Sequence, residues 1–333
     1  MPADSAMTNP PAMREPTHEG VLRAAAKVAA ILPPTPLMPL EIRGQKAWCK
    51  AESLQPVGAF KIRGAWHRLT DLGEAERACG VVAVSSGNHA QGVAWAARRL
   101  GIAATIVMPS DAPEVKLRGT RELGAEIVLY DRPGGESRDE VARELIGDSG
   151  ATLVHAYGDP WVIEGQGSAG IEIEQQLGGP PSRIVAPCGG GGLSAGLALS
   201  CPDAKVVPVE PEGWDDVRRS LIAGKIVPVA ANPPPTACDA LQTLATFPIN
   251  FAVLQERAEP GVAVSEAEVR AAQRFAFSRL RLVVEPGGAA ALAAALAGKV
   301  DLDEATVLIL SGGNVNPAAF ASVIADGLDC PPN

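Results

Sequence analysis

The chain has 333 residues, of which 47% are hydrophobic, so it is long enough to form two domains of ordinary size, each around a core of its own. Its formal net charge of −9 at pH 7 argues against nucleic-acid binding, which requires a basic face. No apolar run reaches the roughly 18 residues that a membrane-spanning helix needs. The polar, proline-rich residues 1–20 are predicted to form a loose arm rather than a signal peptide. The six cysteines have neither zinc-ligand spacing nor a disulfide framework, which predicts reduced thiols and a cytoplasmic location.

Short β-branched segments alternate with Ala- and Leu-rich segments in the first half of the chain. A helix is predicted over residues 62–77, directly after a loop that is rich in Gly and Pro. Strands are predicted at 80–86, 104–109, 125–130 and 151–157, and further helices at 89–101, 114–124 and 137–150. This alternation predicts a parallel sheet with helices packed on its faces.

The same alternation returns in the second half. Residues 183–192 are predicted to form a strand and a glycine run before a helix, 205–211 a strand, and 306–314 a strand with a glycine turn. Three consecutive prolines predict a loop over 231–243. We therefore predict an α/β protein of two three-layer α/β/α units with mostly parallel, open sheets. The larger unit comprises 1–79 and 158–333, and the smaller unit, 80–157, is inserted in it.

Four consecutive glycines, Gly189 to Gly192, follow one of the predicted strands. Such a run costs roughly 2–4 kcal/mol of chain entropy relative to alanine in regular structure, and that cost needs a reason. Glycines let backbone N–H groups converge at the start of the next helix, where they can hold an anion, most often a phosphate. The run lacks the Walker and the GxGxxG patterns. It therefore favours a small phosphate-bearing cofactor, with a flexible turn as the alternative.

Two further strand-to-helix turns carry polar side chains. The turn in residues 84–92 combines hydroxyls, an amide and an imidazole in Ser85, Ser86, Asn88 and His89. This set suits a carboxylate and a proton donor, although an N-cap serine and a turn asparagine would account for one or two of its members. The turn in 308–316 has Ser311 at the end of a strand. Ligands collect at the carboxyl ends of strands in open α/β sheets, so all three turns are candidates for ligand binding.

Lys61 lies beside Phe60 on a loop bounded by Gly and Pro, in the segment LQPVGAFKIRGAW. A lysine next to an apolar side chain can lose its charge by desolvation and act as an amine nucleophile. The alternative is a solvated surface lysine, which is the ordinary state of this residue type. The surroundings of Lys61 argue against that alternative.

Taken together, four segments resemble the signatures of the fold-type II pyridoxal-phosphate enzymes. They are SLQPVGAFKIRGA, SSGNHAQG, GGGGLSAG and LSGGN. The group that they resemble most is the serine/threonine dehydratase and serine racemase family, and the resemblance extends from about residue 25 to 320. It implies the tryptophan synthase β-like fold, pyridoxal 5′-phosphate as cofactor, a small amino-acid substrate and a homodimer. The charge and the hydropathy described above argue against nucleic acid and membrane as partners.

The resemblance also implies a role for each matching residue. Lys61 would bind the cofactor covalently and take the α-proton of the substrate, and Ser86 would transfer a proton on the opposite face of the ring. The cofactor would be held by Phe60 against its ring, Asn88 at its 3-oxygen, Ser311 at its pyridine nitrogen, Glu285 near the ring, and Gly189, Gly190, Gly191 and Gly192 at its phosphate. The substrate carboxylate would be bound by Ser85, Ser86, Asn88 and His89.

Two further matches concern a metal ion and the substrate. In VEPEGWDD, the resemblance implies that Glu210, Asp216 and the carbonyl of Trp214 bind Mg²⁺, or Ca²⁺ or Mn²⁺. An ordinary acidic loop is the alternative. Arg138 matches a position near the substrate, where a guanidinium could bind a second carboxylate, and Thr243 is the matching hydroxyl on the other wall. A surface arginine at a helix start is the alternative there.

These roles predict a dehydratase, that is, an ammonia-lyase, which converts a β-hydroxy amino acid to a 2-oxo acid and ammonia. L-Serine, L-threonine and 3-hydroxyaspartate are the candidate substrates. Three alternatives stay open: a racemase on the same scaffold, a non-catalytic pyridoxal-phosphate-binding protein, and a nucleotide-binding module that rests on the glycine run alone. Gln242 stands where the racemases carry lysine, which argues against racemisation. Ala240 stands where the family often carries glycine, which predicts extra bulk beside the cofactor.

Overall fold

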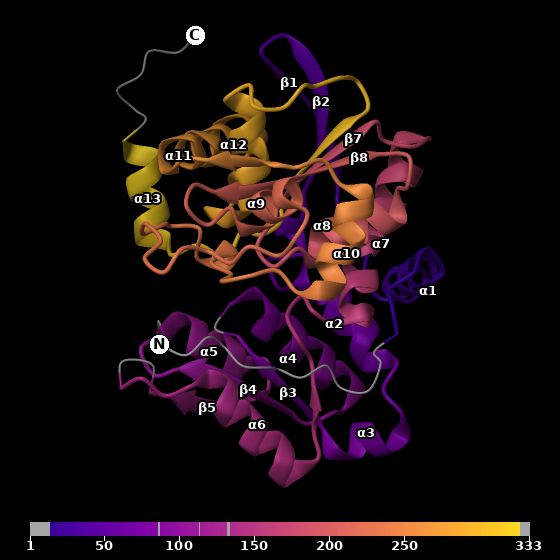
Figure 1. Ribbon diagram of the computed structural model, residues 1–333, viewed down its shortest axis with the longest axis vertical. Helices are drawn as coiled ribbons and strands as arrows, with labels where there is room; N and C mark the ends of the chain where they lie inside the picture. The colour runs from indigo at the N-terminus through magenta and orange to yellow at the C-terminus, as the bar shows by residue number, and fades with distance from the viewer. Residues whose placement is uncertain (1–13, 86, 113, 132–133, 327–333) are drawn as a thin grey trace.

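The computed structural model describes residues 14–85, 87–112, 114–131 and 134–326. Its strands form two sheets that lie in different parts of the molecule (Figure 1). The larger sheet has the order β1-β2-β10-β7-β8-β9, from strands Leu37–Ile42, Gln45–Lys50, Thr306–Ile309, Arg183–Pro187, Lys205–Pro211 and Val262–Val264. The smaller sheet has the order β5-β4-β3-β6, from strands Glu126–Tyr130, Ala104–Pro109, Val81–Val84 and Thr152–Leu153.

Helices surround both sheets (Figure 1). The part that holds the larger sheet contains α1 (His18–Ala29), α7 (Pro160–Leu177), α8 (Gly192–Ser200), α9 (Asp216–Ala223), α10 (Pro248–Arg257), α11 (Glu266–Phe275), α12 (Ala290–Leu296) and α13 (Pro317–Ala325). The part that holds the smaller sheet contains α3 (Glu74–Cys79), α4 (Asn88–Leu100), α5 (Glu114–Glu122) and α6 (Arg138–Ser149). Helix α2 (Lys61–Thr70) lies between the two parts, and the short turns are η1 (Glu52–Leu54), η2 (Asp239–Leu241), η3 (Ala276–Leu280) and η4 (Gly287–Ala289).

Each sheet has helices on both of its faces. In β7, Val185 packs in the cluster that includes α11 and α12, whereas its neighbour Ile184 packs in the cluster that includes α7 and α8. In β3, Val81 packs with α2 and α4, whereas Val82 packs with α6. Within the described ranges, every strand pair is parallel except the antiparallel hairpin of β1 and β2. The predicted three-layer α/β class is therefore confirmed.

Helix α2 belongs to both parts of the molecule. It packs against α4 on one side and α7 on the other. Ile62 and Trp66 contribute to the hydrophobic cluster that covers the smaller sheet, whereas Arg63 forms hydrogen bonds with side chains of α7. Residues on both sides of the boundary predicted between 79 and 80 thus pack in the same hydrophobic cluster. The division into 1–79, 80–157 and 158–333 stays a prediction.

Two predicted segments differ in extent from the structure, and one structural feature was not predicted. The helix predicted over 62–77 is divided, because the chain is extended at Gly73, which precedes α3. The strand predicted over 151–157 pairs only at Thr152–Leu153. Beyond it, His155 Nδ1 accepts the backbone N–H of Gly158 (2.8 Å), which turns the chain away from the sheet. The hairpin of β1 and β2 was not anticipated.

The N-terminal segment is held in place from Arg14 onward. Both terminal nitrogens of Arg14 donate to Glu164 of α7 (2.6 Å each), and the Thr17 N–H donates to the same carboxylate (3.0 Å). Thr17 also caps α1 through its side chain. The part of the expected arm from residue 14 to 20 is therefore fixed against α7, whereas residues 1–13 lie outside the described part of the chain.

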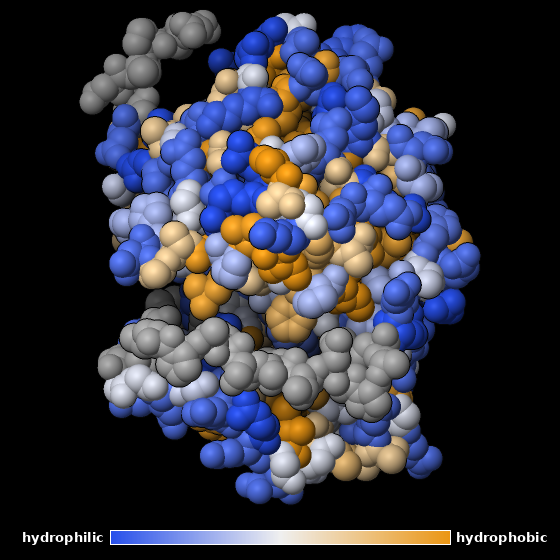
Figure 2. Space-filling model, in the orientation of Figure 1, coloured by the Kyte–Doolittle hydropathy of each residue, from blue (hydrophilic) through white to orange (hydrophobic). Residues whose placement is uncertain are grey.

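The surface of the molecule is mostly hydrophilic on the side that Figure 2 shows, and apolar side chains gather around α9. Among the described helices, none combines the length and the hydropathy that crossing a bilayer requires. The cysteines within the described residues are free thiols, namely Cys49, Cys79, Cys188, Cys201 and Cys238.

Candidate active site

A cavity of about 500 Å³ lies between the two sheets. Its walls are formed by the turns that follow β3, β7 and β10, together with the starts of α2 and α6. The structure thus brings the three polar turns found in the sequence to one place. The predicted site residues that line the cavity are Phe60, Lys61, Ser85, Asn88, His89, Arg138, Gly189, Gly190, Gly191, Gly192, Thr243, Glu285 and Ser311.

Lys61 is the first residue of α2, and the chain that leads to it is paired with the turn after β10. The N–H of Phe60 donates to the carbonyl oxygen of Ser311 (3.1 Å), and the N–H of Gly313 donates to that of Gly58 (2.8 Å). Gly58 has a φ of +71°, and a Cβ there would lie 2.3 Å from a side-chain oxygen of the same turn, so this close approach needs glycine. The glycine-containing loop therefore holds Lys61 against the end of β10.

The amine of Lys61 is buried on the cavity wall. Nζ donates a hydrogen bond to the carbonyl oxygen of Ala156 (2.6 Å) and lies 5.2 Å from the centroid of the Phe60 ring. Desolvation by burial lowers the pKa of Lys61 to about 8. Burial, rather than a neighbouring charge, is thus what makes the neutral amine accessible near neutral pH.

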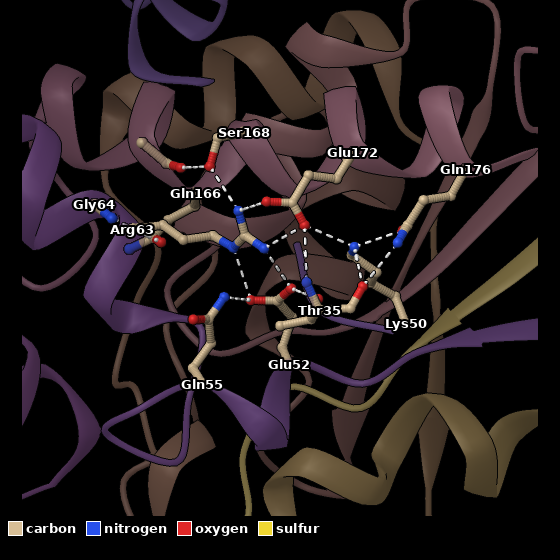
Figure 3. Close-up of polar contacts among 11 residues, drawn as sticks. Thr35, Lys50, Glu52, Gln55, Arg63, Gly64, Gln166, Ser168, Glu172 and Gln176 are labelled. Atoms are coloured by element: carbon tan, nitrogen blue, oxygen red, sulfur yellow. Dashed lines mark hydrogen bonds and ion pairs between the residues drawn. The ribbon is translucent and has the colours of Figure 1, made fainter. Parts of the chain in front are cut away.

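Two residues after Lys61, Arg63 belongs to a buried group of two cations and two carboxylates that joins α2 to α7 and β2 (Figure 3). Arg63 binds Glu52 through Nε and a terminal nitrogen (2.8 Å each) and binds Glu172 of α7 through both terminal nitrogens (2.7 and 2.8 Å). Lys50 of β2 donates to Glu172 (2.7 Å). The charges balance and every ion has hydrogen-bonded partners, which is the condition for burying such a group. We call Lys50, Glu52, Arg63 and Glu172 the buried charge cluster.

The glycine run forms a cradle between β7 and α8. Gly191 has a φ of +90°, which side chains rarely adopt, and a Cβ on Gly190 would lie 2.3 Å from the ring of Tyr157. Helix α8 begins at Gly192, and the N–H groups of its first turn have no partner within the helix. A phosphate fits these N–H groups and the helix dipole.

Asn88 and Glu285 face each other on another wall of the cavity. Asn88 Nδ2 donates to Glu285 Oε1 (2.6 Å), and Asn314 Nδ2 donates to Asn88 Oδ1 (2.8 Å). Burial, opposed by the hydrogen bond from Asn88 and supported by the nearby Asp239, raises the pKa of Glu285 to about 7. Asn88 is thus held from both ends of its amide, in an orientation set by Glu285 and Asn314.

The two histidines of the cavity are uncharged, because burial lowers the pKa of His89 to about 3 and that of His155 to about 4. His89 Nε2 donates to the carbonyl oxygen of Val154 (2.8 Å), and its Nδ1 is buried without a partner among the described residues. The ring therefore has no second N–H to offer a carboxylate. If His89 contacts the substrate carboxylate, as predicted, the donor would be its backbone N–H at the start of α4 rather than its ring. This contact stays a prediction.

The predicted substrate side chains lie at the edges of the cavity. Arg138 is the first residue of α6, half-exposed, and lies 3.6 Å from the carboxylate of Asp139. Thr243 Oγ1 would lie 3.0 Å from a Cβ added to Gly189, so it flanks the glycine run. Ser85 Oγ accepts the N–H of Gly87 (3.2 Å). Ser86 lies outside the described residues.

The predicted metal ligands lie apart from the cavity lining. Glu210 accepts the N–H groups of Val217 (3.0 Å) and Arg218 (2.7 Å), and Asp216 Oδ2 accepts the N–H of Thr246 (2.8 Å). Asp216 Oδ1 is buried and has no partner in the described part of the chain. Burial raises the pKa of Asp216 to about 7 and raises that of Glu210 well above its ordinary value, where Asp216 adds to the effect.

Glu210 and Asp216 alone supply too few ligands for a complete metal centre. Within the described ranges, no three His, Cys, Asp or Glu side chains are grouped to hold a metal ion. A cation here would need backbone carbonyl groups and water besides Glu210 and Asp216, as Mg²⁺ and Ca²⁺ commonly have. The unpartnered Asp216 Oδ1 fits such a cation, because a buried carboxylate oxygen without a partner is costly.

Tyr157 and Asn314 are cavity residues that the sequence analysis did not single out. Asn314 closes the segment LSGGN, so its position was available from the sequence. Tyr157 had no such signal, because a single aromatic residue at the end of a predicted strand is ordinarily part of a core. Its role over the glycine run arises only from the turn that begins at His155.

The cavity of this open α/β fold carries both a buried lysine amine, which can bind an aldehyde, and a glycine cradle, which can bind a phosphate. These two features are typical of enzymes that bind a phosphate-bearing aldehyde. The chain belongs to the family described as pyridoxal-phosphate dependent enzymes, whose sequence pattern matches residues 28–312. The resemblance inferred from the four segments is thereby confirmed.

Comparison with known proteins places ammonia-lyases and racemases among the relatives. The chain is 39% identical over 317 residues to an L-threo-3-hydroxyaspartate ammonia-lyase of Pseudomonas sp, covering 92% of this chain and 98% of the relative. It is 35% identical over 319 residues to a serine racemase of Schizosaccharomyces pombe, covering 93% and 98%. Among solved structures it is similar to a threonine deaminase of T.th., with a TM-score of 0.82, 42% identity, and coverage of 90% of this chain and 99% of that one.

Proposed function

We propose that the chain is a pyridoxal-phosphate dependent ammonia-lyase that converts a β-hydroxy amino acid to a 2-oxo acid and ammonia. The observation that carries the proposal is Lys61, a buried amine with a pKa of about 8 on the cavity wall. An amine in that state can bind an aldehyde and can accept a proton from a bound amino acid. The similarity to a hydroxyaspartate ammonia-lyase supports this reaction class.

The walls of the cavity fit pyridoxal phosphate. The glycine cradle would hold its phosphate, Phe60 would pack beside its ring, and Asn88 and Ser311 would bond its polar edges. When bound, the cofactor supplies an electron sink that makes the α-proton of an amino acid acidic. Lys61 would accept that proton. The hydroxyl of Ser311 does not impose a charged ring nitrogen as a carboxylate would, which favours departure of the β-hydroxyl group.

Substrate choice would depend on Arg138. The first-turn N–H groups of α4 suit the α-carboxylate, since they are free of intrahelical partners. Arg138, at the start of α6, is a guanidinium on the same cavity and suits a second carboxylate. L-Serine, L-threonine and 3-hydroxyaspartate all fit the reaction, and Arg138 favours 3-hydroxyaspartate among them.

Racemisation on the same scaffold is the second candidate, supported by the similarity to a serine racemase. It requires a proton donor on the face of the substrate opposite Lys61, a role that the family resemblance implies for Ser86. Incubation with L-serine separates the two reactions, because elimination yields pyruvate whereas racemisation yields D-serine. Replacing Ser86 with alanine should reduce D-serine formation more than pyruvate formation.

We further propose that Glu210 and Asp216, with the carbonyl group of Trp214, bind Mg²⁺ or a similar divalent cation. The unpartnered Asp216 Oδ1 supports this proposal. Since the pair does not line the cavity, the cation would support the structure rather than contact the substrate. Calorimetric titration with Mg²⁺ after chelator treatment tests the site, and absence of binding would refute it.

We also propose a cytoplasmic homodimer. Leu54, Val283 and Phe277 are apolar and exposed by 53%, 46% and 42%. Val283 and Ser53, which precedes Leu54, lie next to Gly313 at the turn after β10. A second copy of the chain would cover these side chains. Free thiols in the described residues are consistent with a reducing compartment. Light scattering of the purified protein at several concentrations tests the assembly, and a monomer at every concentration would refute it.

The decisive experiment is a panel of β-hydroxy amino acids assayed for both 2-oxo acid and ammonia. We expect turnover in the wild type and none in Lys61→Ala. The matched control is Lys46→Ala, which removes a lysine that is exposed on the surface and paired with Glu304. A wild type that binds the cofactor without turning over any member of the panel would refute the ammonia-lyase proposal.

A further inference from the structure

Hydrogen bonds connect the carboxylate pair to the glycine cradle, and Thr246 lies between them. Its N–H donates to Asp216 Oδ2 (2.8 Å), and its hydroxyl donates to the carbonyl oxygen of Gly190 (3.1 Å). Thr246 is buried, so neither bond can be exchanged for one to water without moving the chain. A displacement of Asp216 is therefore transmitted to Gly190 through a single residue.

The segment that follows Thr246 supports the cradle from a second side. Asn250, in the first turn of α10, donates Nδ2 to the carbonyl oxygen of Tyr157 (3.0 Å), and the ring of Tyr157 packs over Gly190. A Cβ added to Gly191 would lie 3.4 Å from both Asn250 Cβ and Thr246 Oγ1. The cradle is thus in close contact with this segment, and the position of Thr246 constrains the position of the cradle.

One oxygen of the carboxylate pair is left for a cation. Both oxygens of Glu210 accept N–H groups of α9, and Asp216 Oδ2 accepts the N–H of Thr246. Asp216 Oδ1 is buried and unpartnered among the described residues. A cation bound at Oδ1 would fix the plane of the carboxylate whose other oxygen holds Thr246.

We propose that Thr246 is a positioning residue that couples the two sites, so that a divalent cation at Glu210 and Asp216 tightens binding of the cofactor phosphate by the glycine cradle. This inference rests on the proposed function, which supplies both ligands. Coupling of two sites is reciprocal, so the cofactor must tighten cation binding by the same factor. A connection through one neutral hydrogen bond sets that factor at about fivefold.

The experiment measures the two binding constants separately, without an activity assay. Apoenzyme is titrated with pyridoxal phosphate by equilibrium dialysis, once with chelator and once with MgCl₂, and Mg²⁺ is titrated calorimetrically into apoenzyme and holoenzyme. We expect wild type to bind pyridoxal phosphate about fivefold more tightly with Mg²⁺, and Mg²⁺ about fivefold more tightly with cofactor.

Variants assign the coupling to the hydroxyl. Thr246→Val keeps the main-chain bond to Asp216 and removes the bond to Gly190, so the ratio should fall to about one, whereas Thr246→Ser should restore it. Thr120→Val is the matched control, because Thr120 is equally buried and also donates to a backbone carbonyl, that of Lys116, but within α5. It should keep the wild-type ratio.

The outcomes separate this inference from the proposed function. If both ligands bind to the wild type independently of each other, or if Thr246→Val keeps the ratio, Thr246 does not couple the sites and only this inference is overturned. If Mg²⁺ does not bind at all, both the proposed cation site and the coupling are overturned. If pyridoxal phosphate does not bind, the proposed function itself is overturned. The wild-type comparison needs no variant, so a variant that fails to fold does not prevent the test.

Discussion

Replacing Glu52 with glutamine is expected to reduce the free energy of unfolding by about 3 kcal/mol or more. Glu52 is fully buried and accepts two hydrogen bonds from Arg63. Although desolvation opposes ionisation, Arg63 and then Lys50 and Thr35 lower the pKa of Glu52 from 4.5 to about 2. That difference corresponds to roughly 3 kcal/mol in favour of the ionised carboxylate. Glutamine keeps the shape and leaves a net positive charge uncompensated in the buried charge cluster.

The assay is urea unfolding of the apoprotein as a function of pH. Because the pKa of Glu52 is depressed in the folded protein, its contribution to stability is present above about pH 4.5 and is lost as the pH falls towards about 2. The difference between wild type and Glu52→Gln should therefore be constant near neutral pH and shrink below pH 4.5. Glu304→Gln, which removes an exposed carboxylate paired with Lys46, is the control and should cost under about 0.5 kcal/mol. A loss below about 1 kcal/mol for Glu52→Gln would show that the cluster does not stabilise the fold as described.

Three further predictions concern the cavity. The rate at which apoenzyme takes up pyridoxal phosphate should rise with pH through about 8, since only the neutral amine of Lys61 reacts, and a rate independent of pH from 7 to 9 would contradict this. Arg138→Gln should lower kcat/KM for 3-hydroxyaspartate by about tenfold or more and change kcat/KM for L-serine by less than about twofold. The control is Arg118→Gln, which removes an exposed arginine. Equal effects of Arg138→Gln on both substrates would exclude a role in binding a second carboxylate. Gly190→Ala should weaken cofactor binding in equilibrium dialysis by about tenfold or more, because the added Cβ meets the ring of Tyr157. Gly179→Ala is the control and should leave binding unchanged, because Gly179 has open space around it. Unchanged cofactor binding in Gly190→Ala would argue against the cradle.

Local patterns were sufficient to predict much of the fold. The strand predicted at 104–109 coincides with β4, and the helix predicted at 89–101 differs from α4 by one residue at each end. Gly101, with a φ of +67°, ends that helix in the left-handed conformation that glycine favours. Glycine signals and β-branched runs act over a few residues, so their information is contained in the segment itself.

The buried charge cluster was not predictable in the same way. Glu172 is separated along the chain from Lys50 by 122 residues and from Arg63 by 109. Each of these charged residues alone would be expected on the surface, and only the packing of α2 and β2 against α7 makes burial favourable. The turn at His155 was missed for a related reason: the hydrogen bond that ends the strand comes from a side chain, and no periodic pattern records it.

The pairing of residues 58–60 with 311–313 has a consequence for biosynthesis. Strand β10 lies between β2 and β7, so the larger sheet cannot be completed until Thr306–Ile309 has left the ribosome. The main-chain hydrogen bonds that hold residues 58–60, and with them the neighbouring Lys61, are made with Ser311 and Gly313, which follow β10. On the proposed function, a nascent chain would therefore bind pyridoxal phosphate only after residue 313 has been synthesised. Contacts of such long sequence separation also form slowly, which places assembly of this wall of the cavity among the last events of folding.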